Sequence, residues 1–289
     1  MKEEIKYCEI QLEKDKSFYF DHVHIVWNEQ ITLHQSPTWE LSYVMTGSGT
    51  RIVGDRMETF SAGEVVFLPP NIPHGWYFDE FDHDEQGKIE NITIIFPVDW
   101  LHKCIAAFPE TEHFMMQIEQ YKDAVKFEGD TQISLQNIMT RMLGENSLEH
   151  ISSLLNILNI IASSAEKQIV GVNTKQNRSQ LKMQEVARYM VNNYQEKIKL
   201  EDVAKFVGMN RSSFCSFFKR EKGKSFFTAL TEYRIDCSCL MLRETSKPVA
   251  EICYAVGFDD VPHYNRTFKK LKGRTPKDYR AKQLELLQQ

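Results

Sequence analysis

Residues 203–225 read VAKFVGMNRSSFCSFFKREKGKS, and residues 252–276 read ICYAVGFDDVPHYNRTFKKLKGRTP. The two stretches follow one pattern. Gly208 aligns with Gly257 at an offset of 49, whereas Phe218 aligns with Phe268 at an offset of 50, so the second copy has one additional residue in its turn. A repeat of this kind predicts a duplicated structural unit. Each unit should be a helix, a tight turn at glycine and a second helix with a basic end.

Local signals place the helix ends of the first unit. A short helix over 200–206 should stop at Val207-Gly208, because glycine adopts the left-handed backbone of a tight helix exit. Asn210 can cap the next helix, over 211–222. An earlier helix over 180–194 is indicated by apolar residues at helical spacing.

The second unit repeats these signals. Pro248 precedes a helix that ends at Ala255, and Asp259 or Asp260 caps a helix over about 261–272. A helix over 226–244 should join the two units. Its length of roughly 28 Å, at ~1.5 Å per residue, is close to one turn of DNA at ~34 Å.

The second helix of each unit has an inward and an outward face. Phe214 and Phe218 in one unit, and Tyr264 and Phe268 in the other, are spaced i, i+4 and should face the core. The opposite faces carry small or polar residues and basic ends, which suits a helix in the major groove of DNA. The candidate DNA-contacting residues are Arg211, Ser212, Cys215, Ser216 and Lys219 in the first unit and Pro262, Asn265, Arg266, Lys269 and Lys270 in the second.

Charge is divided unevenly along the chain. Residues 180–289 contain 21 Lys+Arg and 13 Asp+Glu, a net charge of +8. Residues 1–179 contain 14 and 27, a net charge of −13, which together with +8 makes the −5 of the whole chain. A basic half joined to an acidic half predicts that only the C-terminal half meets a polyanion.

The C-terminal half resembles the AraC/XylS family of transcription regulators over about 100 residues. The motifs that carry the resemblance are Ile252-Cys-Tyr-Ala-Val-Gly-Phe258, Tyr264-Asn-Arg-Thr-Phe-Lys269, Gly273-Arg-Thr-Pro276 and Tyr279-Arg280. Cys253 and Pro262 stand where the family usually has Ala and Ser. The resemblance implies a cytoplasmic regulator that binds double-stranded DNA, with RNA polymerase as a further partner. It also implies an N-terminal cupin-like effector domain.

The N-terminal part is rich in short, strand-like segments. Turn signals such as Gly47-Ser-Gly49, Gly54-Asp55 and Ala62-Gly63 separate them. Many short strands at close spacing predict a β-sandwich or barrel. The expected strands cover 18–27, 40–46, 50–53, 57–60, 64–68 and 91–96.

Spacing in this part resembles the cupin pattern, in which His and Glu residues bind a metal. His34 is followed by Glu40, and a later run of turns leads to His74. Ser36 stands where the pattern has a second histidine, and serine is a poor ligand for a divalent transition metal. We therefore expect no metal, no cofactor and no catalytic residue. Three ligands can nevertheless hold a metal, so hydrogen-bonded pocket residues and a metal site remain the two interpretations.

A small barrel can hold one ligand in its mouth. Because side chains alternate along a strand, Glu40 should face the interior while Trp39 and Tyr43 face away. Aromatic plates with a few hydrogen-bonding groups suit a small polar effector, and likeness to sugar-responsive regulators makes a carbohydrate the candidate. The alternative is that the aromatic residues only fill the core. The candidate ligand-binding residues are His34, Glu40, Arg51, His74 and Trp76.

Helical spacing begins at Asp99, with expected helices over 99–120, 132–143 and 148–167. The last has an apolar stripe that indicates either core packing or a homodimer formed through the N-terminal half. The expected fold class is α+β: a cupin-like barrel (1–96), a helical block (97–167), a linker (168–179) and an all-α domain with two helix-turn-helix units (180–289).

Composition excludes several classes of protein. No run of 18 apolar residues is present, so no membrane span or membrane partner is expected. The charged N-terminus lacks the apolar core of a signal peptide, and the six cysteines form no CxxC pair, which fits the cytoplasm. Two alternatives to a sequence-specific regulator remain: a cupin-type metalloenzyme with a helical accessory domain, and an architectural DNA binder that ignores sequence.

Overall fold

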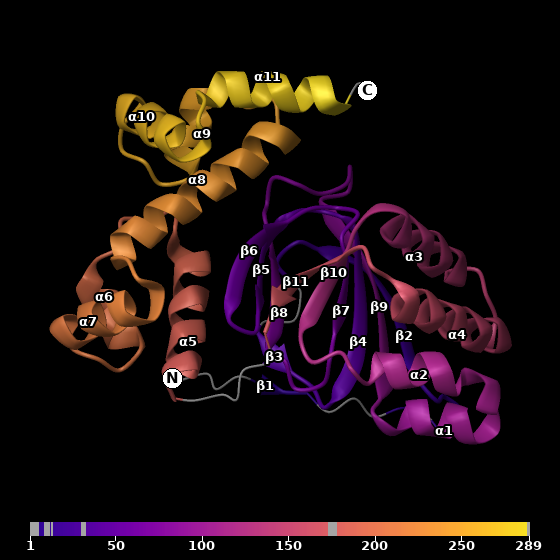
Figure 1. Cartoon of the computed structure of the whole chain (residues 1–289). Coiled ribbons are helices and arrows are strands. Elements are labelled where there is room, and N and C mark those ends of the chain that lie inside the picture. The colour runs from indigo at the N-terminus through magenta and orange to yellow at the C-terminus, as the bar shows by residue number, and fades with distance from the viewer. Residues whose placement is uncertain (1–5, 9–11, 13, 30–32, 173–177, 288–289) are drawn as a thin grey trace. The chain divides into compact units, whose positions relative to one another are not determined.

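The computed structural model describes residues 6–8, 12, 14–29, 33–172 and 178–287 (Figure 1). The chain divides into two compact units, Met1–Lys175 and Gln176–Gln289. The predicted fold class is confirmed, because strands followed by helices form the first unit and helices alone form the second. Within the described residues, no helix has the length and apolar character needed to cross a membrane.

Strands dominate the first unit. Their bounds are β1 Lys6–Tyr7, β2 Tyr19–Val26, β3 His34–Gln35, β4 Thr38–Thr46, β5 Gly49–Val53, β6 Arg56–Phe60, β7 Val65–Leu68, β8 His74–Phe78, β9 Lys88–Pro97, β10 Ala124–Phe127 and β11 Lys167–Gly171. They form two sheets, in the orders β1-β3-β8-β5-β6 and β11-β10-β7-β4-β9-β2. Nearly all neighbouring strands are antiparallel, which allows the short connections of a cupin-like barrel.

Alternation along β4 separates two environments. Trp39 and Leu41 are buried in a core that β4 shares with the helices of this unit, and Trp39 stacks on Phe67 with ring centroids 5.3 Å apart. Glu40 and Ser42 lie on the other face of the strand and are also buried. The sequence prediction that Glu40 faces the barrel interior, away from Trp39, is therefore confirmed.

Four α-helices and one short 3-10 helix cover the outer face of the six-stranded sheet (Figure 1). Their bounds are α1 Asp99–Ala107, η1 Pro109–Thr111, α2 Glu112–Ile118, α3 Gly129–Met142 and α4 Ser147–Ser163. Pro109 divides the helix expected over 99–120, because proline has no amide hydrogen for the helical ladder. Leu154, Leu158 and Ile161 of α4 are fully buried, so most of the apolar stripe is core.

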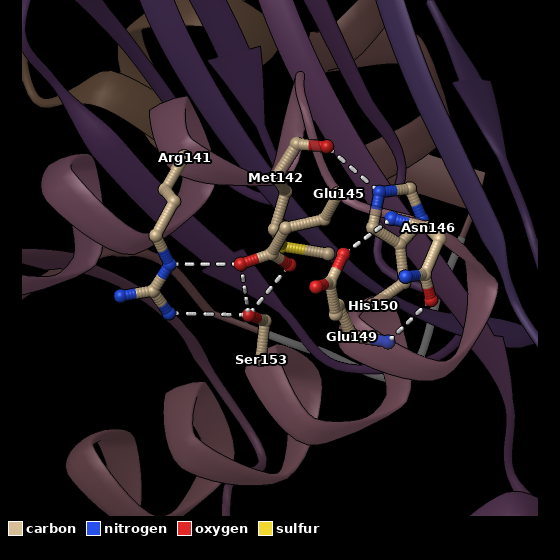
Figure 2. Close-up of polar contacts among 7 residues, drawn as sticks. All are labelled: Arg141, Met142, Glu145, Asn146, Glu149, His150 and Ser153. Carbon is tan, nitrogen blue, oxygen red and sulfur yellow. Dashed lines mark hydrogen bonds and ion pairs between the residues drawn. The ribbon is translucent and has the colours of Figure 1, made fainter.

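Polar contacts fix the corner between α3 and α4 (Figure 2). The Arg141 Nε of α3 donates to Glu145 at 2.8 Å, and the Ser153 hydroxyl of α4 donates to the same carboxylate at 2.7 Å. Asn146 and Glu149 form a capping box at the start of α4, which satisfies amide groups that have no partner within the helix. The two helices therefore meet at a defined angle.

Apolar side chains remain exposed beside this corner. Leu143 is 41% exposed, Leu148 is 75% exposed and Ile151 is 36% exposed. The sequence assigned Leu148 and Ile151 to the same stripe as the buried residues of α4. In the structure this first turn and a half of α4 is the part of the stripe that remains exposed.

Several segments differ from the sequence prediction. β3 and β8 were not among the expected strands, and the helix expected over 148–167 ends at Ser163. Residues 124–127 of the predicted helical block form β10, and residues 168–171 of the predicted linker lie in β11. β10 pairs with both β7 and β11, so hydrogen bonds across the sheet, rather than local propensity, make these segments strands. The barrel sheet thus extends beyond residue 96. Residues 173–177 of the predicted linker lie outside the described residues.

The second unit consists of helices α5 Arg178–Asn193, α6 Leu200–Phe206, α7 Arg211–Lys222, α8 Phe226–Glu244, α9 Val249–Ala255, α10 Val261–Lys272 and α11 Pro276–Leu287. The offset is 49 between α6 and α9 but 50 between α7 and α10. The additional residue of the second copy therefore lies in the turn, as predicted. The sequence prediction did not include α11.

Matching caps define the two turns. Gly208 and Gly257 adopt positive φ angles of 65° and 85°, which a residue with a Cβ rarely does. The Asn210 side chain accepts from the Ser213 amide at 2.8 Å, and the Asp260 side chain accepts from the His263 amide at the same distance. Of the two aspartates considered, Asp260 is the cap. Each unit thus begins its second helix at a fixed residue.

Candidate nucleic-acid interface and ligand site

The helices α7 and α10 present the predicted outward faces to solvent. Phe214, Phe218, Tyr264 and Phe268 are at most 2% exposed and hold the helices against the rest of the unit. Of the predicted contact residues, only Asn265 is half-buried. Arg211, Ser212, Cys215, Ser216, Lys219, Pro262, Arg266, Lys269 and Lys270 are exposed.

Both outward faces end in basic residues. The last turn of α7 contains Lys219, and that of α10 contains Lys269 and Lys270. These lysines make no ion pair with any described residue, so their charges are available to phosphate groups. By contrast, Arg211 forms an ion pair with Glu201 at 3.2 Å, which a phosphate would have to replace.

The two faces differ in chemistry. Ser212, Cys215 and Ser216 give α7 a surface of short side chains. Arg266 gives α10 a long side chain that can make two hydrogen bonds to guanine. Neither face has a buried charged group among its candidate contact residues.

In the barrel, the structure brings His34, Glu40 and His74 together. His34 of β3 is the register partner of His74 of β8, and their rings lie 4.4 Å apart. Glu40 of β4 comes from the other sheet, and its carboxylate lies 3.1 Å from His74 Nε2. One potential ligand atom from each residue lies within 4.8 Å of the others. Residues 40 positions apart in sequence therefore form one polar cluster inside the barrel.

Hydrogen bonds decide the protonation of His74. Its Nδ1–H donates to the Ile72 carbonyl at 2.8 Å, and its Nε2 faces the Glu40 carboxylate. Burial by itself lowers the pKa of His74, but the Glu40 charge and these hydrogen bonds raise it above its ordinary value of 6.5. Burial by itself raises the pKa of Glu40, but His74 and His34 bring it below 4.5. The two residues form a buried ion pair.

The other two candidate ligand residues lie on the same sheet as His74. Trp76 is two residues further along β8, with its ring 5.7 Å from the His74 ring, and its register partner on β5 is Arg51. Arg51 is 3% exposed and forms ion pairs with Glu58 and Glu64. Its Nε is buried and has no hydrogen-bond partner among the described residues. The sequence reading found Arg51 but missed both glutamates.

The cluster also fits a divalent metal. Glu40 and the two histidines supply three ligands, and the Nδ1–H bond to Ile72 is the kind of contact that orients a metal-binding histidine. A metal would take the place of the proton on His74 Nε2. Ser36 gives no further imidazole, and its hydroxyl lies 2.7 Å from that of Thr38. The sequence expectation of no metal stays a prediction.

Sequence reasoning also missed Asp79, which directly follows β8. Burial, with the charges of Asp82 and Glu80, raises the pKa of Asp79 to about 7. One of its carboxylate oxygens is buried and has no hydrogen-bond partner in the described part of the chain. The acidic run after Phe78 was the available signal.

Comparison with known families separates the chain into the same two parts. A family described as a helix-turn-helix domain matches residues 203–282, and one described as a cupin domain matches residues 21–81. The uncharacterized HTH-type transcriptional regulator YdeC of Bacillus subtilis is 33% identical over 99 residues, which cover 34% of each chain. This match and that to the MmsAB operon regulatory protein of Pseudomonas aeruginosa span only about a third of those relatives.

A longer alignment is found at lower identity. The HTH-type transcriptional activator RhaR of Mannheimia succiniciproducens is 20% identical over 257 residues, which cover 86% of this chain and 87% of the relative. Among solved structures, a regulator with an AraC-type DNA-binding domain from Chromobacterium violaceum is 30% identical and covers 36% of this chain and 94% of its own, with a TM-score of 0.35.

The Glu40–His74 pair predicts a pH dependence of stability. His74 has a folded-state pKa above 6.5, so its contribution is complete below that pH and is lost as pH rises through the folded pKa. Glu40 has a folded-state pKa below 4.5, so its contribution is present above 4.5 and is lost in acid. We expect the stability difference between the unmodified protein and His74→Gln to be largest between these limits and to shrink at higher pH.

Urea unfolding followed by tryptophan fluorescence measures this effect, because Trp27, Trp39, Trp76 and Trp100 all belong to the first unit. EDTA keeps metal ions from replacing the proton on His74. Asp79 titrates in the same range, so the difference between variants, not the raw curve, isolates the pair. His22→Gln is the control, since His22 pairs with Glu90 at the surface. A His74→Gln difference that is constant with pH would contradict the ion pair.

Proposed function

We propose that this chain, which carries an AraC-type helix-turn-helix domain and a cupin domain, is a sequence-specific DNA-binding transcription regulator. The observation that carries the proposal is the pair of 12-residue helices α7 and α10, each capped, anchored by buried aromatic rings and exposed along one face. Short or hydrogen-bonding side chains on that face can approach base edges. Lys219, Lys269 and Lys270 near the helix ends, which form no ion pair with a described residue, can neutralise phosphates.

Two other functions are less well supported. The domains and relatives are those of AraC-family regulators rather than of an enzyme, which disfavours a cupin-type metalloenzyme. An architectural DNA binder would need contacts to the DNA backbone only. Arg266 and Asn265 carry groups suited to base edges, which favours a sequence-specific protein.

The N-terminal unit, Met1–Lys175, would bind the effector and form the homodimer. The buried His34, Glu40 and His74 cluster, with Trp76 beside it, supports a small polar effector, for which a carbohydrate is the candidate. The exposed apolar residues at the α3–α4 corner support a homodimer. Contact with RNA polymerase would follow from the role of a regulator.

Selection of bound fragments from a random DNA library tests the function. A recurring motif is expected, and its two halves should lie about one turn of DNA apart. Equal recovery of all sequences would instead support the architectural function.

Substitutions in α10 should separate base reading from phosphate contact. Arg266→Ala is expected to weaken binding to the selected site by about 1–3 kcal/mol and to relax the preference at one base position. Lys270→Ala should weaken binding evenly across sequences and reduce the salt slope by about 1. Fluorescence anisotropy at several salt concentrations measures both. If the Arg266 substitution changes neither affinity nor base preference, Arg266 is not one of the residues that contact bases.

Effector binding should depend on the buried cluster. We expect one member of a panel of monosaccharides to change the tryptophan fluorescence, because Trp76 is next to His74. Glu40→Gln should then weaken the binding of that sugar by about tenfold, because one hydrogen bond to a charged group is lost. Glu90→Gln at the surface is the matched control. Metal analysis of the same sample distinguishes a bound ion, and a sugar response unchanged by Glu40→Gln would place the ligand elsewhere.

Dimer formation should depend on the α3–α4 corner. Leu148→Glu places a charge at the most exposed apolar residue and should convert the dimer to a monomer in sedimentation equilibrium. Ile133→Glu introduces the same change at another exposed residue of the hairpin, 55% exposed, and should leave the dimer intact. A dimer that survives Leu148→Glu would exclude this surface.

A further inference from the structure

We call α7 and α10 the reading helices. Two arginines outside them make equivalent contacts. Arg234 of α8 donates from Nε to the Tyr194 carbonyl at 2.7 Å and from Nη2 to the Glu196 carbonyl at 2.8 Å. Arg280 of α11 donates from Nε to the Leu242 carbonyl at 3.2 Å and from Nη2 to the Lys247 carbonyl at 2.7 Å. Each guanidinium thus bridges two carbonyls around the end of an earlier helix, α5 for Arg234 and α8 for Arg280. We call these contacts the first and second clamps.

The clamps extend the repeat. Both arginines follow a tyrosine, and both lie on the helix that comes after a reading helix. Arg234 is 11 residues after Gly223, whereas Arg280 is 7 residues after Gly273. The difference of four residues is about one helical turn, so the two arginines project from the same side of their helices. Each helix-turn-helix unit therefore has its own clamp at the point where the chain enters it.

The first clamp also touches the second helix-turn-helix unit. Gly257, in the turn of the second unit, lies so close that a Cβ there would be 2.6 Å from the Tyr194 carbonyl oxygen. The same Cβ would lie 2.8 Å from the Gln195 carbonyl oxygen and 2.9 Å from Arg234 Cζ. The turn between α9 and α10 therefore rests directly on the Tyr194 carbonyl, which Arg234 also holds, and on the neighbouring Gln195 carbonyl.

The additional residue of the second turn also belongs to this contact. Asp259 lies in the five-residue turn that replaces the four-residue turn of the first unit. Burial lowers the pKa of Arg234, and the Asp259 charge acts in the opposite direction, so a carboxylate of the second unit faces a cation of the α8 helix. A groove of about 520 Å³ opens beside them, lined by Lys197 and Phe227 as well as Tyr254. At this point the two helix-turn-helix units meet through polar and backbone contacts.

We propose that Arg234 and Gly257 are positioning residues that set the separation and rotation of α7 relative to α10, and hence the half-site spacing that the protein accepts. The proposal rests on the proposed DNA-binding function, because spacing matters only if both helices read DNA. α8 connects the two helix-turn-helix units, and helices of both units pack against it. The clamp adds a constraint on their relative rotation, since a planar guanidinium with two acceptors holds a defined orientation.

The first experiment measures spacing preference. The selected DNA site is lengthened or shortened by one base pair between its halves, which moves one half by about 3.4 Å and roughly 36°. The unmodified protein should lose about tenfold in affinity on either change. The Arg234→Gln variant should lose less than about threefold in affinity, because its two helix-turn-helix units adjust to the altered spacing. Arg280→Gln removes the second clamp by the same substitution and should keep the original preference.

A pair of glycine variants provides a second comparison. Gly257→Ala and Gly273→Ala both place a Cβ at a positive φ, 85° and 75° respectively. Only Gly257 has backbone atoms in the way, whereas nothing lies within 4 Å of a Cβ at Gly273. Gly257→Ala should therefore shift or broaden the preferred spacing, and Gly273→Ala should not. Circular dichroism checks that each variant is folded, and Arg234→Lys is the milder variant if Arg234→Gln is not.

A distance measurement tests the clamp without DNA. Cys215 on α7 is exposed, and Lys270→Cys adds a second labelling site on α10 in a protein whose half-buried Cys8 and Cys104 are replaced by serine. Electron spin resonance should give a narrow distance distribution that Arg234→Gln broadens and Arg280→Gln does not. Equal distributions, or spacing preferences that coincide for all variants, would overturn the proposal. Failure to select any DNA motif would instead overturn the proposed function, while the distance result still decides the clamp.

Discussion

The Arg234 guanidinium of α8 donates hydrogen bonds to two backbone carbonyls just beyond the end of α5, those of Tyr194 and Glu196. Carbonyls at the end of a helix need such partners from outside it. The arrangement of the C-terminal unit depends on this interaction, because three parts of the chain meet there. α5 ends beside it, α8 supplies the donors, and the turn at Gly257 packs on one of the two carbonyls, that of Tyr194. A longer side chain at Gly257 would push the second unit away. The Arg234 guanidinium thus links the packing of the first helix-turn-helix unit to the position of the second.

A different constraint governs the barrel. Glu40 and His74 are both buried, and a buried charge is costly unless it is paired. Their mutual contact and the Ile72 carbonyl satisfy that requirement within the protein. Any ligand that enters must therefore compete with an existing ion pair, or join it by hydrogen bonds to the remaining lone pairs. Arg51 is similar, since Glu58 and Glu64 compensate its charge, but its Nε still lacks a partner among the described residues.

Local signals in the sequence were sufficient for the C-terminal helices. Asn210 and Asp260 cap, Gly208 and Gly257 end helices, and the phenylalanine spacing marks the buried face, so α6 to α10 could be predicted almost to the residue. Contacts between distant segments could not be predicted from local signals. β10 and β11 are strands only because they pair across the sheet. The clamps join residues 33 to 40 positions apart, and the partners of Arg51 depend on strand register. Glu40 and His74 were found because a family pattern, not local propensity, connects them.

Because the outward faces of α7 and α10 differ in chemistry, the relative position of the two helix-turn-helix units would affect their proposed contacts with DNA. Ser212 and Ser216 reach base edges only if the α7 backbone lies deep in the groove, since their side chains are short. Arg266, Lys269 and Lys270 on α10 have long side chains that can adjust over several ångströms. A small rotation between the units would therefore cost α7 its contacts before it affected α10. Under the proposed function, a first helix-turn-helix unit that reads DNA through short side chains requires a rigid connection to the second, and we propose that the contact of Arg234 with the Gly257 turn provides it.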